Sequence, residues 1–502
     1  MEGEVILAKN IMVQGTASSV GKSLLTAALC RILKEDGYNV TPYKSQNMAL
    51  NSYITRDGKE MGRAQVVQAE AAKIEPMVEM NPILLKPTSD VGSQVIINGN
   101  VYANTSAEEY YKLKPKLKGI IKKAYDKLST IFEAIVIEGA GSPAEINLRE
   151  NDIVNMGLAE LVDSPVILVG DIDRGGVFAA IYGTIMLLEP EERERIKGFI
   201  INKFRGDVEL LKPGIKMIEE KINKPCLGVI PYMSINIDDE DSVTTRFDND
   251  RNNRINIGII KLPYLSNFTD FTPLELEGDV SVKYLSDKNH FKDIDLLIIP
   301  GSKNTINDMK FLLESGFNKE IYLKNKEGIP IIGICGGYQM LGQEIVDPEH
   351  VESSTSKING LALLKTSTTI LSTKQTKQVT GRVRNCLEIC EGIKGETISG
   401  YEIHMGITDI TGNSKSAIEL EEGILDGAVN FEENVFGTYL HGIFEDDNFR
   451  NSLLEGMRKK KGIDINDHQV NYKRFKEMEY DKLANLVREN IDIQVVKEIM
   501  GL

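Results

Sequence analysis

A cysteine in the second half of the sequence has the surroundings of a catalytic nucleophile. Cys335 ends the apolar run IPIIGIC and is followed at once by Gly336 and Gly337, then by a helical pattern. A sharp strand-to-helix turn with small neighbours exposes such a side chain, and the next backbone N–H groups face a developing oxyanion. The helix N-terminus favours the thiolate, which is the nucleophilic form. We therefore expect Cys335 to be a nucleophile, with oxyanion donors at Gly336 and at the Gly301-Ser302 turn.

A nucleophilic thiol requires a general base, and the sequence contains five His residues. His441 ends the short apolar run VFGTYLH, so it is the expected partner of Cys335, while His404 in SGYEIHMG is the alternative. A cysteine that lacks a glycine-rich turn is more often an inert core thiol. That interpretation applies to the four other cysteines: Cys30, Cys226, Cys386 and Cys390.

A second set of residues, near the N-terminus, has the pattern of a phosphate-binding loop. The segment begins at Gly15, ends with Gly21, Lys22 and Ser23, follows an apolar run and precedes a helical pattern. In such loops the backbone N–H groups face phosphate oxygens, the Lys supplies a positive charge and the Ser hydroxyl binds Mg²⁺. The loop is a variant, because Thr16 stands where the strict pattern has its first Gly. This chemistry fits ATP with Mg²⁺.

Polar residues at the ends of later apolar runs strengthen the nucleotide prediction. Glu138 ends FEAIVIE, Asp171 and Asp173 follow SPVILVG, and Asn202 and Lys203 follow KGFII. In open α/β sheets, ligands bind outside the carboxyl ends of the strands. We expect Glu138 to share a Mg²⁺ ion with the loop serine, and the Asn-Lys pair to contact the purine. Each acidic residue taken singly could instead cap a turn or helix.

The elements that must position these residues read as two α/β domains. Short apolar runs that end in Gly, Asp or Asn alternate with longer amphipathic stretches, which is typical of buried parallel strands and crossover helices. The pattern stops in an acidic, Asn-rich stretch and then restarts. We predict two doubly wound, mostly parallel sheets. The expected ranges are a first α/β domain with the phosphate loop at 1–234, an acidic linker at 235–254, a second α/β domain with Cys335 at 255–445 and a helical C-terminal extension at 446–502.

Composition excludes several classes of protein. The chain has 502 residues, 41% hydrophobic and 26% charged, which is ordinary for a folded globular protein. The net charge of −15 disfavours nucleic-acid binding. Five cysteines without metal-like spacing suit a reducing compartment. Because Glu2 and Glu4 replace the positive charge of a signal peptide and no long apolar run occurs, we expect a cytoplasmic protein with no membrane partner.

The sequence resembles the cobyric acid synthase family, the glutamine-dependent amidotransferases of cobalamin biosynthesis. The matching blocks follow one another over nearly the whole chain: QGTASSVGKS, YKSQNMALNS, KEMGRAQ, NPILLKPTSD, IEGAGSPAEINL, DIDRGGVFAAIYGT, INKFRGD, LSNFTDF, PGSKNT, GICGGYQMLG, SGYEIHMG and GTYLHGIF. The resemblance implies a synthetase domain similar to dethiobiotin synthetase and a triad-type glutaminase domain. It also implies ATP-driven amidation of peripheral carboxylates of adenosylcobyrinic acid a,c-diamide, with glutamine as nitrogen donor. The matched family residues are Lys22, Ser23, Glu138, Cys335 and His441.

One position departs from the family of triad glutaminases. These enzymes usually carry a Glu two residues after the His, where it fixes the ring, but that position is Ile443 here. We therefore expect a Cys-His dyad, with the ring of His441 held by a backbone carbonyl or loosely by Glu402 or Glu445.

A corrinoid with many carboxylates requires local cationic or amide donors despite the acidic total. The candidate substrate residues are Lys44, Gln46, Asn47, Asp152, Asp173 and Arg174, of which Asp152 is equally well explained as a helix cap. A partition-type ATPase also uses a variant phosphate loop, but it needs a Lys four residues before the last Gly of the loop. That position is Ala17, which counts against this class. A related amidoligase, such as cobyrinic acid a,c-diamide synthase or a cell-wall precursor amidotransferase, would share both sites. Only the blocks KSQNMALNS and GSPAEINL favour cobyric acid synthase over these alternatives.

Overall fold

The computed structural model of the chain describes residues 7–89, 92–237, 252–464 and 470–502. Contacts divide the chain into two compact units. Unit 1 comprises Met1–Ala49, Glu60–Glu240 and Arg474–Leu502, and unit 2 comprises Leu50–Lys59 and Asp241–Lys473. Each unit contains its own α/β sheet, which confirms the predicted fold class.

Unit 1 is built on a sheet whose ladders among the described residues are all parallel. Apolar, β-branched runs form these strands because both faces of the sheet are covered by helices. The strand order is β12 (Cys226–Pro231), β11 (Ile196–Phe204), β10 (Val166–Asp171), β1 (Lys9–Gly15), β9 (Ala134–Glu138) and β2 (Val40–Tyr43). The register pairs Val13 with Glu138 and Asp171 with Asn202, so the polar strand ends lie at one edge of the sheet.

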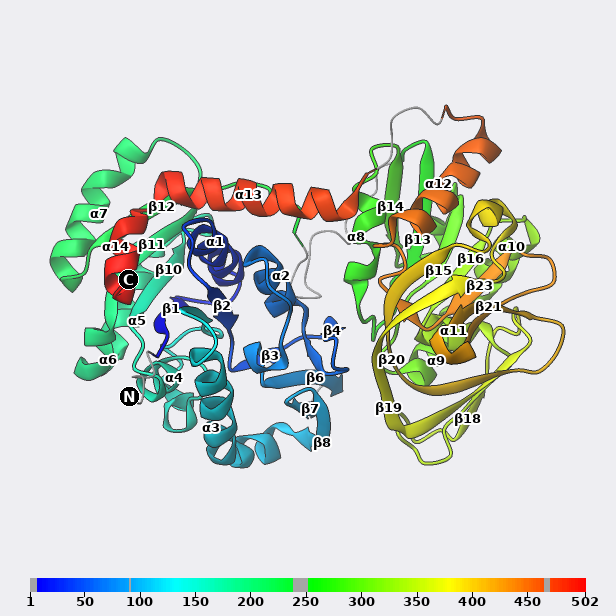
Figure 1. The fold of residues 1–502 in the computed structure, drawn as a ribbon, viewed down its shortest axis with the longest axis horizontal. Helices are drawn as coiled ribbons and strands as arrows, with labels where there is room; N and C mark the ends of the chain where they lie inside the picture. The colour runs from blue at the N-terminus through cyan, green and yellow to red at the C-terminus, as the bar shows by residue number, and fades with distance from the viewer. Residues whose placement is uncertain (1–6, 90–91, 238–251, 465–469) are drawn as a thin grey trace, which may run out of the picture. The chain divides into compact units, whose positions relative to one another are not determined.

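Helices cover this sheet (Figure 1). The phosphate loop leads into α1 (Lys22–Glu35), whose buried face packs in one apolar cluster with α13 (Tyr472–Asn490) and α14 (Ile493–Met500). A smaller sheet has the order β3 (Gln46–Met48), β6 (Ile83–Ser89), β7 (Gly92–Ile97) and β8 (Asn100–Ser106). The other helices of the unit are α2 (Arg63–Ala71), α3 (Ala107–Ser129), α4 (Met156–Leu161), α5 (Val177–Leu187), α6 (Pro190–Arg195) and α7 (Val208–Ile222).

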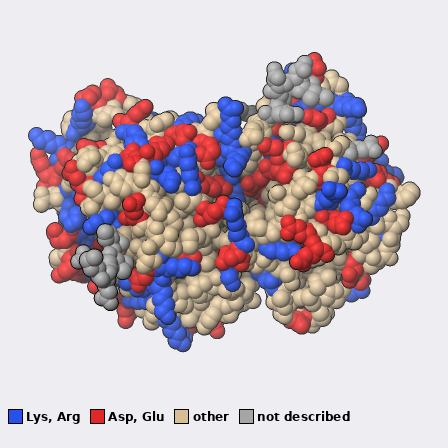
Figure 2. All heavy atoms as spheres, in the orientation of Figure 1, with Lys and Arg blue, Asp and Glu red and all other residues tan. Residues whose placement is uncertain are grey.

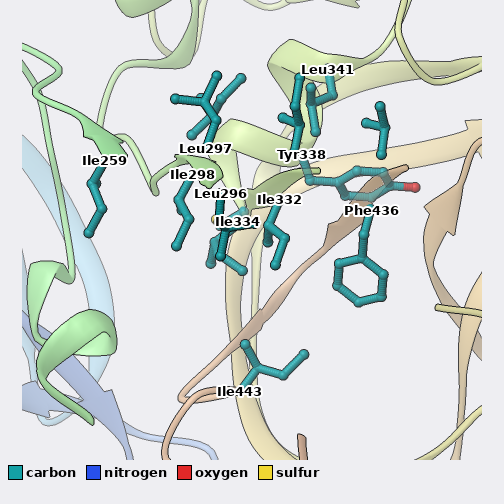
Figure 3. Packing of buried hydrophobic residues seen from close by; sticks show 14 of the residues in the cluster. Ile259, Leu296, Leu297, Ile298, Ile332, Ile334, Tyr338, Leu341, Phe436 and Ile443 are labelled. Carbon is teal, nitrogen blue, oxygen red and sulfur yellow. The ribbon is translucent and has the colours of Figure 1, made fainter. Parts of the chain in front are cut away.

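Unit 2 has a parallel half and an antiparallel half. The parallel strands are β14 (Val280–Leu285), β13 (Ile255–Ile260), β15 (Leu296–Ile299), β16 (Ile331–Ile334) and β23 (Val435–Thr438). Their Ile and Leu side chains pack against Tyr338 and Leu341 of α11 (Gly336–Leu341) in the core of the unit (Figure 3). The helices α8 (Thr272–Glu275), α9 (Thr305–Ser315), α10 (Phe317–Lys326) and α12 (Asp447–Lys461) complete this half.

The sheet of unit 2 continues beyond β23 through strands that the apolar runs did not reveal. These are β22 (Leu425–Val429), β21 (Lys415–Leu420), β19 (Thr366–Val383), β17 (Glu344–Val346) and β18 (Lys357–Asn359), with β20 (Thr397–Ile410) paired to β19 and to β24 (Leu440–His441). The long strand β19 is rich in Thr, Lys and Gln, and both β19 and its partner β20 are only half-buried. Such strands lack the continuous apolar run that identifies a central strand of a parallel sheet.

The boundaries differ from the predicted ranges in two places, and the expected linker is largely outside the described residues. Most of the expected linker falls on residues 238–251, which lie outside the described part of the chain. The expected C-terminal extension is divided, since α12 belongs to unit 2 and residues from Arg474 onward belong to unit 1. Residues 50–59, which were assigned to the synthetase range, belong to unit 2. The C-terminal residues and residues 50–59 are assigned by their contacts within each unit, which a linear reading of composition does not contain.

Charge is spread over the surface. On the face that Figure 2 shows, acidic and basic side chains are interspersed, so the net charge of −15 is not gathered into one patch there. None of the helices in the described residues combines the length and the apolar character needed to cross a membrane.

Candidate active sites

The phosphate loop joins β1 to α1 and has the local geometry that a nucleotide site requires. Gly21 has a φ of 99°, and a Cβ atom at this position would lie 2.2 Å from the Nδ2 atom of Asn202, so only Gly fits. The Nζ atom of Lys22 donates hydrogen bonds to Ala17 O at 2.9 Å and to Gly141 O at 3.0 Å. These loop carbonyls hold the ammonium group at the N-terminus of α1, where a bound phosphate is stabilised.

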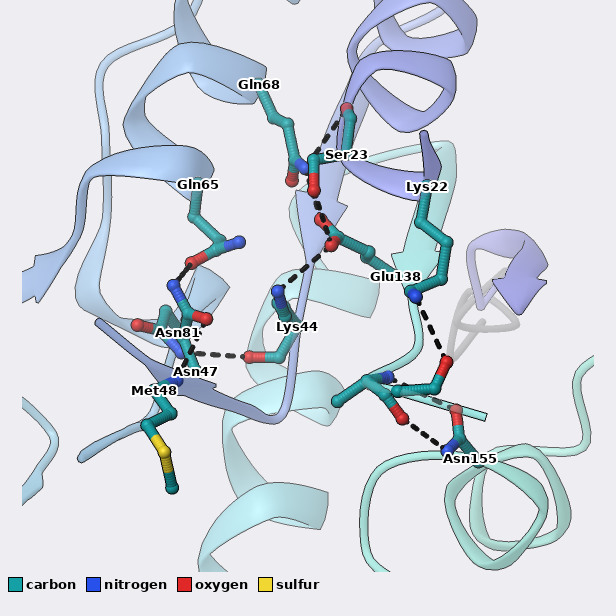
Figure 4. Close-up of polar contacts among 12 residues, drawn as sticks. Lys22, Ser23, Lys44, Asn47, Met48, Gln65, Gln68, Asn81, Glu138 and Asn155 are labelled. Carbon is teal, nitrogen blue, oxygen red and sulfur yellow. Dashed lines mark hydrogen bonds and ion pairs between the residues drawn. The ribbon is translucent and has the colours of Figure 1, made fainter. Parts of the chain in front are cut away.

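Glu138 lies at the centre of a buried polar cluster beside the loop (Figure 4). Its Oε1 atom accepts hydrogen bonds from Ser23 Oγ at 2.8 Å and from Lys44 Nζ at 2.9 Å, and its Oε2 atom accepts one from Gln68. A buried carboxylate remains charged only when it is paired in this way. Glu138 and Lys44 thus connect the loop to the segment before β3.

The same cluster offers oxygen ligands suited to Mg²⁺. The hydroxyl of Ser23 and the carboxylate of Glu138 are hard oxygen donors, 2.8 Å apart. The buried Oε1 atom of Gln68 has no hydrogen-bond partner among the described residues, so a further oxygen ligand is available. Mg²⁺ binds proteins through one or two such groups and completes its shell with phosphate and water. These residues fit the ion.

Asn202 and Lys203, predicted to contact the purine, hold the phosphate loop in this structure. Asn202 Nδ2 donates to Val20 O at 2.8 Å. Lys203 Nζ donates to Ser19 O at 2.6 Å and to Asp171 Oδ2 at 2.9 Å. These bonds bring the end of β11 and the end of β10 to the loop. A direct contact with the base stays a prediction.

Three candidate substrate residues lie just before or within β3. The structure connects this segment to the polar cluster around Glu138. Lys44 bonds to Glu138, and Asn47 Nδ2 donates to Gln65 Oε1 at 3.2 Å (Figure 4). Gln46 accepts a hydrogen bond from Tyr110 Oη at 2.6 Å. Their role toward a substrate stays a prediction.

The remaining substrate candidates have structural partners. Asp152 accepts hydrogen bonds from three backbone N–H groups, at residues 154, 155 and 157, which is the capping role left open above. Asp173 pairs with Arg205 at 2.8 Å. The side chain of Arg174 is 73% exposed and lies 4.0 Å from Asp171. Nothing in these contacts links the three residues to one another.

Cys335 lies at the turn between β16 and α11 with a backbone φ of 51°. A positive φ is strained for a residue with a Cβ atom, and such strain concentrates at functional turns. The two glycines that follow are required by close packing, because a Cβ atom at Gly337 would lie 1.9 Å from Ile299 O. One at Gly336 would lie 2.9 Å from Ser302 N. The two expected oxyanion donors, Gly336 and the Gly301-Ser302 turn, are therefore neighbours.

His441 interacts with both Cys335 and a buried carboxylate. Cys335 is close enough to contribute to the pKa of the ring, and the Nδ1 atom of His441 lies 2.6 Å from the Oδ2 atom of Asp270. The other oxygen of Asp270 accepts the backbone N–H of Gly442 at 3.1 Å. Asp270 is 2% exposed and lies in the 3₁₀ helix η4 (Phe268–Phe271). The expected dyad is therefore wrong: a buried carboxylate orients the ring.

Neither Glu402 nor Glu445, the two described residues expected to hold the His441 ring loosely, is its hydrogen-bond partner. Glu402 instead lies 3.6 Å from Lys377 and 4.0 Å from His404. Sequence spacing could not reveal Asp270, which is 171 residues from its partner. The one signal was its position in the block LSNFTDF, a polar loop between two apolar runs.

The charges around His441 determine its protonation. Burial alone would lower its pKa, but the charge and hydrogen bond of Asp270, together with Cys335, raise the pKa to about 10. The ring is therefore an imidazolium near neutral pH, with its Nδ1 proton directed at Asp270. An adjacent imidazolium is the cation that stabilises a reactive thiolate. The arrangement can attack a carboxamide and protonate the departing nitrogen.

The alternative base, His404, has a different environment. Its ring stacks on Tyr439 with the centroids 3.8 Å apart, and its Nδ1 atom lies 2.7 Å from Gly406 O. Burial lowers its pKa to about 4, so the ring is neutral near pH 7. These contacts favour His441 as the general base.

Asp270→Asn is expected to impair glutamine hydrolysis severely. Removing the carboxylate charge lowers the pKa of His441, and an Asn can hold the ring in the wrong tautomer. The equivalent change in a serine triad costs about 10⁴-fold in kcat. We expect a loss on the order of 10³ to 10⁴-fold, and a fall in activity that begins at lower pH than in the wild type. Glutamate release across a pH series measures both effects.

Glu445→Ala is the matched control, since it removes an acidic side chain four residues after His441. This variant should keep at least about a tenth of the activity, as expected for a carboxylate that does not orient the base. If Asp270→Asn lost no more than Glu445→Ala, the assignment of Asp270 would be wrong.

Comparisons with known proteins agree with two catalytic units. Residues 11–261 match the model of the CobQ/CobB/MinD/ParA nucleotide binding domain, and residues 256–449 match the CobB/CobQ-like glutamine amidotransferase domain. Full-length relatives are named cobyric acid synthase. One from Caldanaerobacter subterraneus subsp. tengcongensis is 53% identical, with coverage of 98% of this chain and 99% of the relative. One from Alkaliphilus metalliredigens is 55% identical, with coverage of 97% and 99%.

Among solved structures, the similarity is remote. The structure of PurLQS from Thermotoga maritima matches with a TM-score of 0.32 and 21% identity, covering 40% of this chain and 98% of that one.

Proposed function

Because the chain belongs to the cobyric acid synthase family, we propose that it amidates peripheral carboxylates of adenosylcobyrinic acid a,c-diamide, with ATP as activator and glutamine as nitrogen source. The observation that carries this proposal is the buried Cys335–His441–Asp270 set, with His441 hydrogen-bonded to Asp270, in a chain that also holds a phosphate loop. A glutaminase alone would have no use for the loop. A nucleotide switch alone would have no use for the thiol. Full-length similarity to proteins named cobyric acid synthase favours this reaction over cobyrinic acid a,c-diamide synthesis.

The glutaminase step begins with attack by the Cys335 thiolate on the side-chain carboxamide carbon of glutamine. Backbone N–H groups at Gly336 and the Gly301-Ser302 turn stabilise the oxyanion that forms. His441 donates its proton to the nitrogen, the C–N bond breaks, and ammonia leaves behind a thioester on Cys335. His441 then takes a proton from water, the oxygen of that water adds to the thioester carbon, and the C–S bond breaks to give glutamate, the Cys335 thiolate and the imidazolium.

The synthetase step uses the ammonia. A substrate carboxylate oxygen attacks the γ-phosphorus of ATP, ADP leaves, and an acyl phosphate forms; ammonia then displaces phosphate and gives the amide. Lys22 and the loop N–H groups neutralise the charge that develops on the phosphates. Bound Mg²⁺, held by Ser23 and Glu138, would supply further charge neutralisation at the β- and γ-phosphates. Lys44, whose Nζ atom lies 2.9 Å from Glu138 Oε1, is the residue proposed to receive the substrate carboxylate, together with the β3 segment.

The proposed reaction has a defined nucleotide product. Purified protein, Mg²⁺, ATP, glutamine and the corrinoid should yield one ADP and one glutamate for each new amide, because the γ-phosphoryl group is transferred. Mass spectrometry of the corrinoid counts the amides, and chromatography identifies the nucleotide. Formation of AMP and pyrophosphate would contradict acyl-phosphate chemistry, and an unchanged corrinoid would contradict the substrate.

A further inference from the structure

A short segment from the N-terminal part of the sequence contacts the residues that surround His441. Residues 50–54, here called the 50–54 segment, include β4 (Ser52–Ile54) and belong to unit 2. Asn51 and Ser52 are each 1% exposed, and Ile54 is fully buried against Tyr401. The segment is thus a buried part of the glutaminase unit, although it follows Lys44 of unit 1 by only a few residues.

The first set of contacts leads to the edge of the His441 ring. Ser52 N donates to Asn267 Oδ1 at 3.1 Å, and Asn51 Oδ1 accepts the backbone N–H of Phe268 at 3.1 Å. The Nδ2 atom of Asn267 lies 3.4 Å from His441 Nδ1, the atom that also contacts Asp270. Asn267 and Phe268 open the η4 turn that carries Asp270. The segment therefore holds both the amide beside the ring and the start of the turn.

The second set of contacts leads to the face of the same ring. Tyr401 Oη donates to Ser52 O at 3.2 Å, and the ring of Tyr53 packs on that of Tyr401 with the centroids 5.3 Å apart. Tyr401 in turn stacks on His441, with 5.4 Å between centroids and 19° between planes. Asn267 at the edge of the imidazole and Tyr401 on its face thus connect the ring to the 50–54 segment.

We propose that the 50–54 segment is a positioning element of the glutaminase, which acts through Asn267 and Tyr401 to hold the imidazole of His441 against Cys335. This inference rests on the proposed glutaminase role of Cys335 and His441. It follows that the glutaminase unit includes a piece of chain from the sequence range that matches the nucleotide-binding domain. A displacement of about 1 Å at a catalytic group can cost on the order of a hundredfold in rate, so a small movement of the segment would be felt at the base.

The decisive variant is Asn267→Gly in the full-length protein. Asn267 has a φ of 52°, which Gly adopts without strain, so the change removes the side chain and spares the turn. We expect the kcat of glutamine hydrolysis to fall by roughly tenfold to a hundredfold, with KM changed less than about threefold. Amidation with added ammonia should be unchanged. Tyr401→Phe, which loses the bond to Ser52 but keeps the stacked ring, should show a smaller loss of the same kind.

Two further variants separate positioning from general damage. Thr376→Val removes the 2.8 Å bond to Gly58 O, outside the 50–54 segment, and should leave kcat unchanged. Asn267→Asp keeps the acceptor for Ser52 N but adds negative charge beside the ring, which is also faced by Asp270, Cys335 and His404. It should move the alkaline limit of the pH profile upward, whereas Asn267→Gly should not.

The outcomes are distinct. Wild-type kcat in Asn267→Gly, or an equal loss in Thr376→Val, would overturn the positioning role. If the wild-type protein released no glutamate, or if Cys335→Ser released as much, the proposed function itself would fail.

Discussion

Cys335→Ser is expected to abolish amidation supported by glutamine and to leave amidation supported by ammonia close to the wild-type rate. The serine hydroxyl is a far weaker nucleophile near neutral pH, so no thioester forms and no ammonia is released. Loss of a nucleophile of this type costs on the order of 10⁴-fold or more in turnover. The synthetase residues around Lys22 and Glu138 lie in unit 1 and do not take part in that step.

The measurement is amide formation with glutamine and, in parallel, with ammonium salt at a pH that provides free ammonia. Cys386→Ser is a matched control, because Cys386 is a buried cysteine of the same unit that lies away from the glycine-rich turn. It should keep both activities. A folded Cys335→Ser protein that had lost both would contradict the assignment of the two half-reactions to separate sites.

Lys22→Ala is expected to suppress amidation from either nitrogen source. The ammonium group of Lys22 is held at the N-terminus of α1 by loop carbonyls, in position to neutralise the transferring phosphoryl group. Removal of one such stabilising group typically costs 10² to 10³-fold, so we expect a loss on the order of 10³-fold in acyl-phosphate formation. Cys335 and His441 remain intact in this variant, so glutamate release provides an internal check that the protein is folded.

Lys118→Ala, which alters an exposed lysine of α3, is the control and should behave as the wild type. The quantity to compare is ADP formed in the presence of ammonia and the corrinoid. If the Lys22→Ala protein still formed ADP and amide at the wild-type rate, the phosphate loop would not be the site of ATP activation.

The sequence predicted those parts of the two sites that are contiguous in the chain. The phosphate loop, with Lys22 and Ser23, and the turn at Cys335 each combine a strand, small residues and a helix within one short stretch, so local steric rules identify them. Glu138 was found because strand ends of a parallel sheet meet at one edge. These inferences need only the local pattern and the fold class.

The parts that the sequence did not predict depend on contacts across long separations. Asp270 meets His441 through the packing of η4 against β24, and no periodicity in either segment signals that meeting. Arg31, which is buried in α1, donates hydrogen bonds to Glu477 and Asp481 of α13. Contacts of this kind assign the C-terminal helices to unit 1. Residues 50–59 belong to unit 2, although the residues on either side in the sequence belong to unit 1, because their contacts lie in unit 2. Tertiary burial, rather than composition, decides such placements.

The most direct test of the central claim uses glutamine labelled with heavy nitrogen in its side-chain amide. The wild-type protein, supplied with this glutamine, Mg²⁺, ATP and adenosylcobyrinic acid a,c-diamide, is analysed by mass spectrometry of the corrinoid. The account predicts that each new amide carries the heavy nitrogen and that ADP accumulates in equal number. A corrinoid that gained no amide, or amides free of the label while labelled ammonia accumulated in solution, would contradict a single chain that releases ammonia at Cys335 and delivers it to an ATP-activated carboxylate.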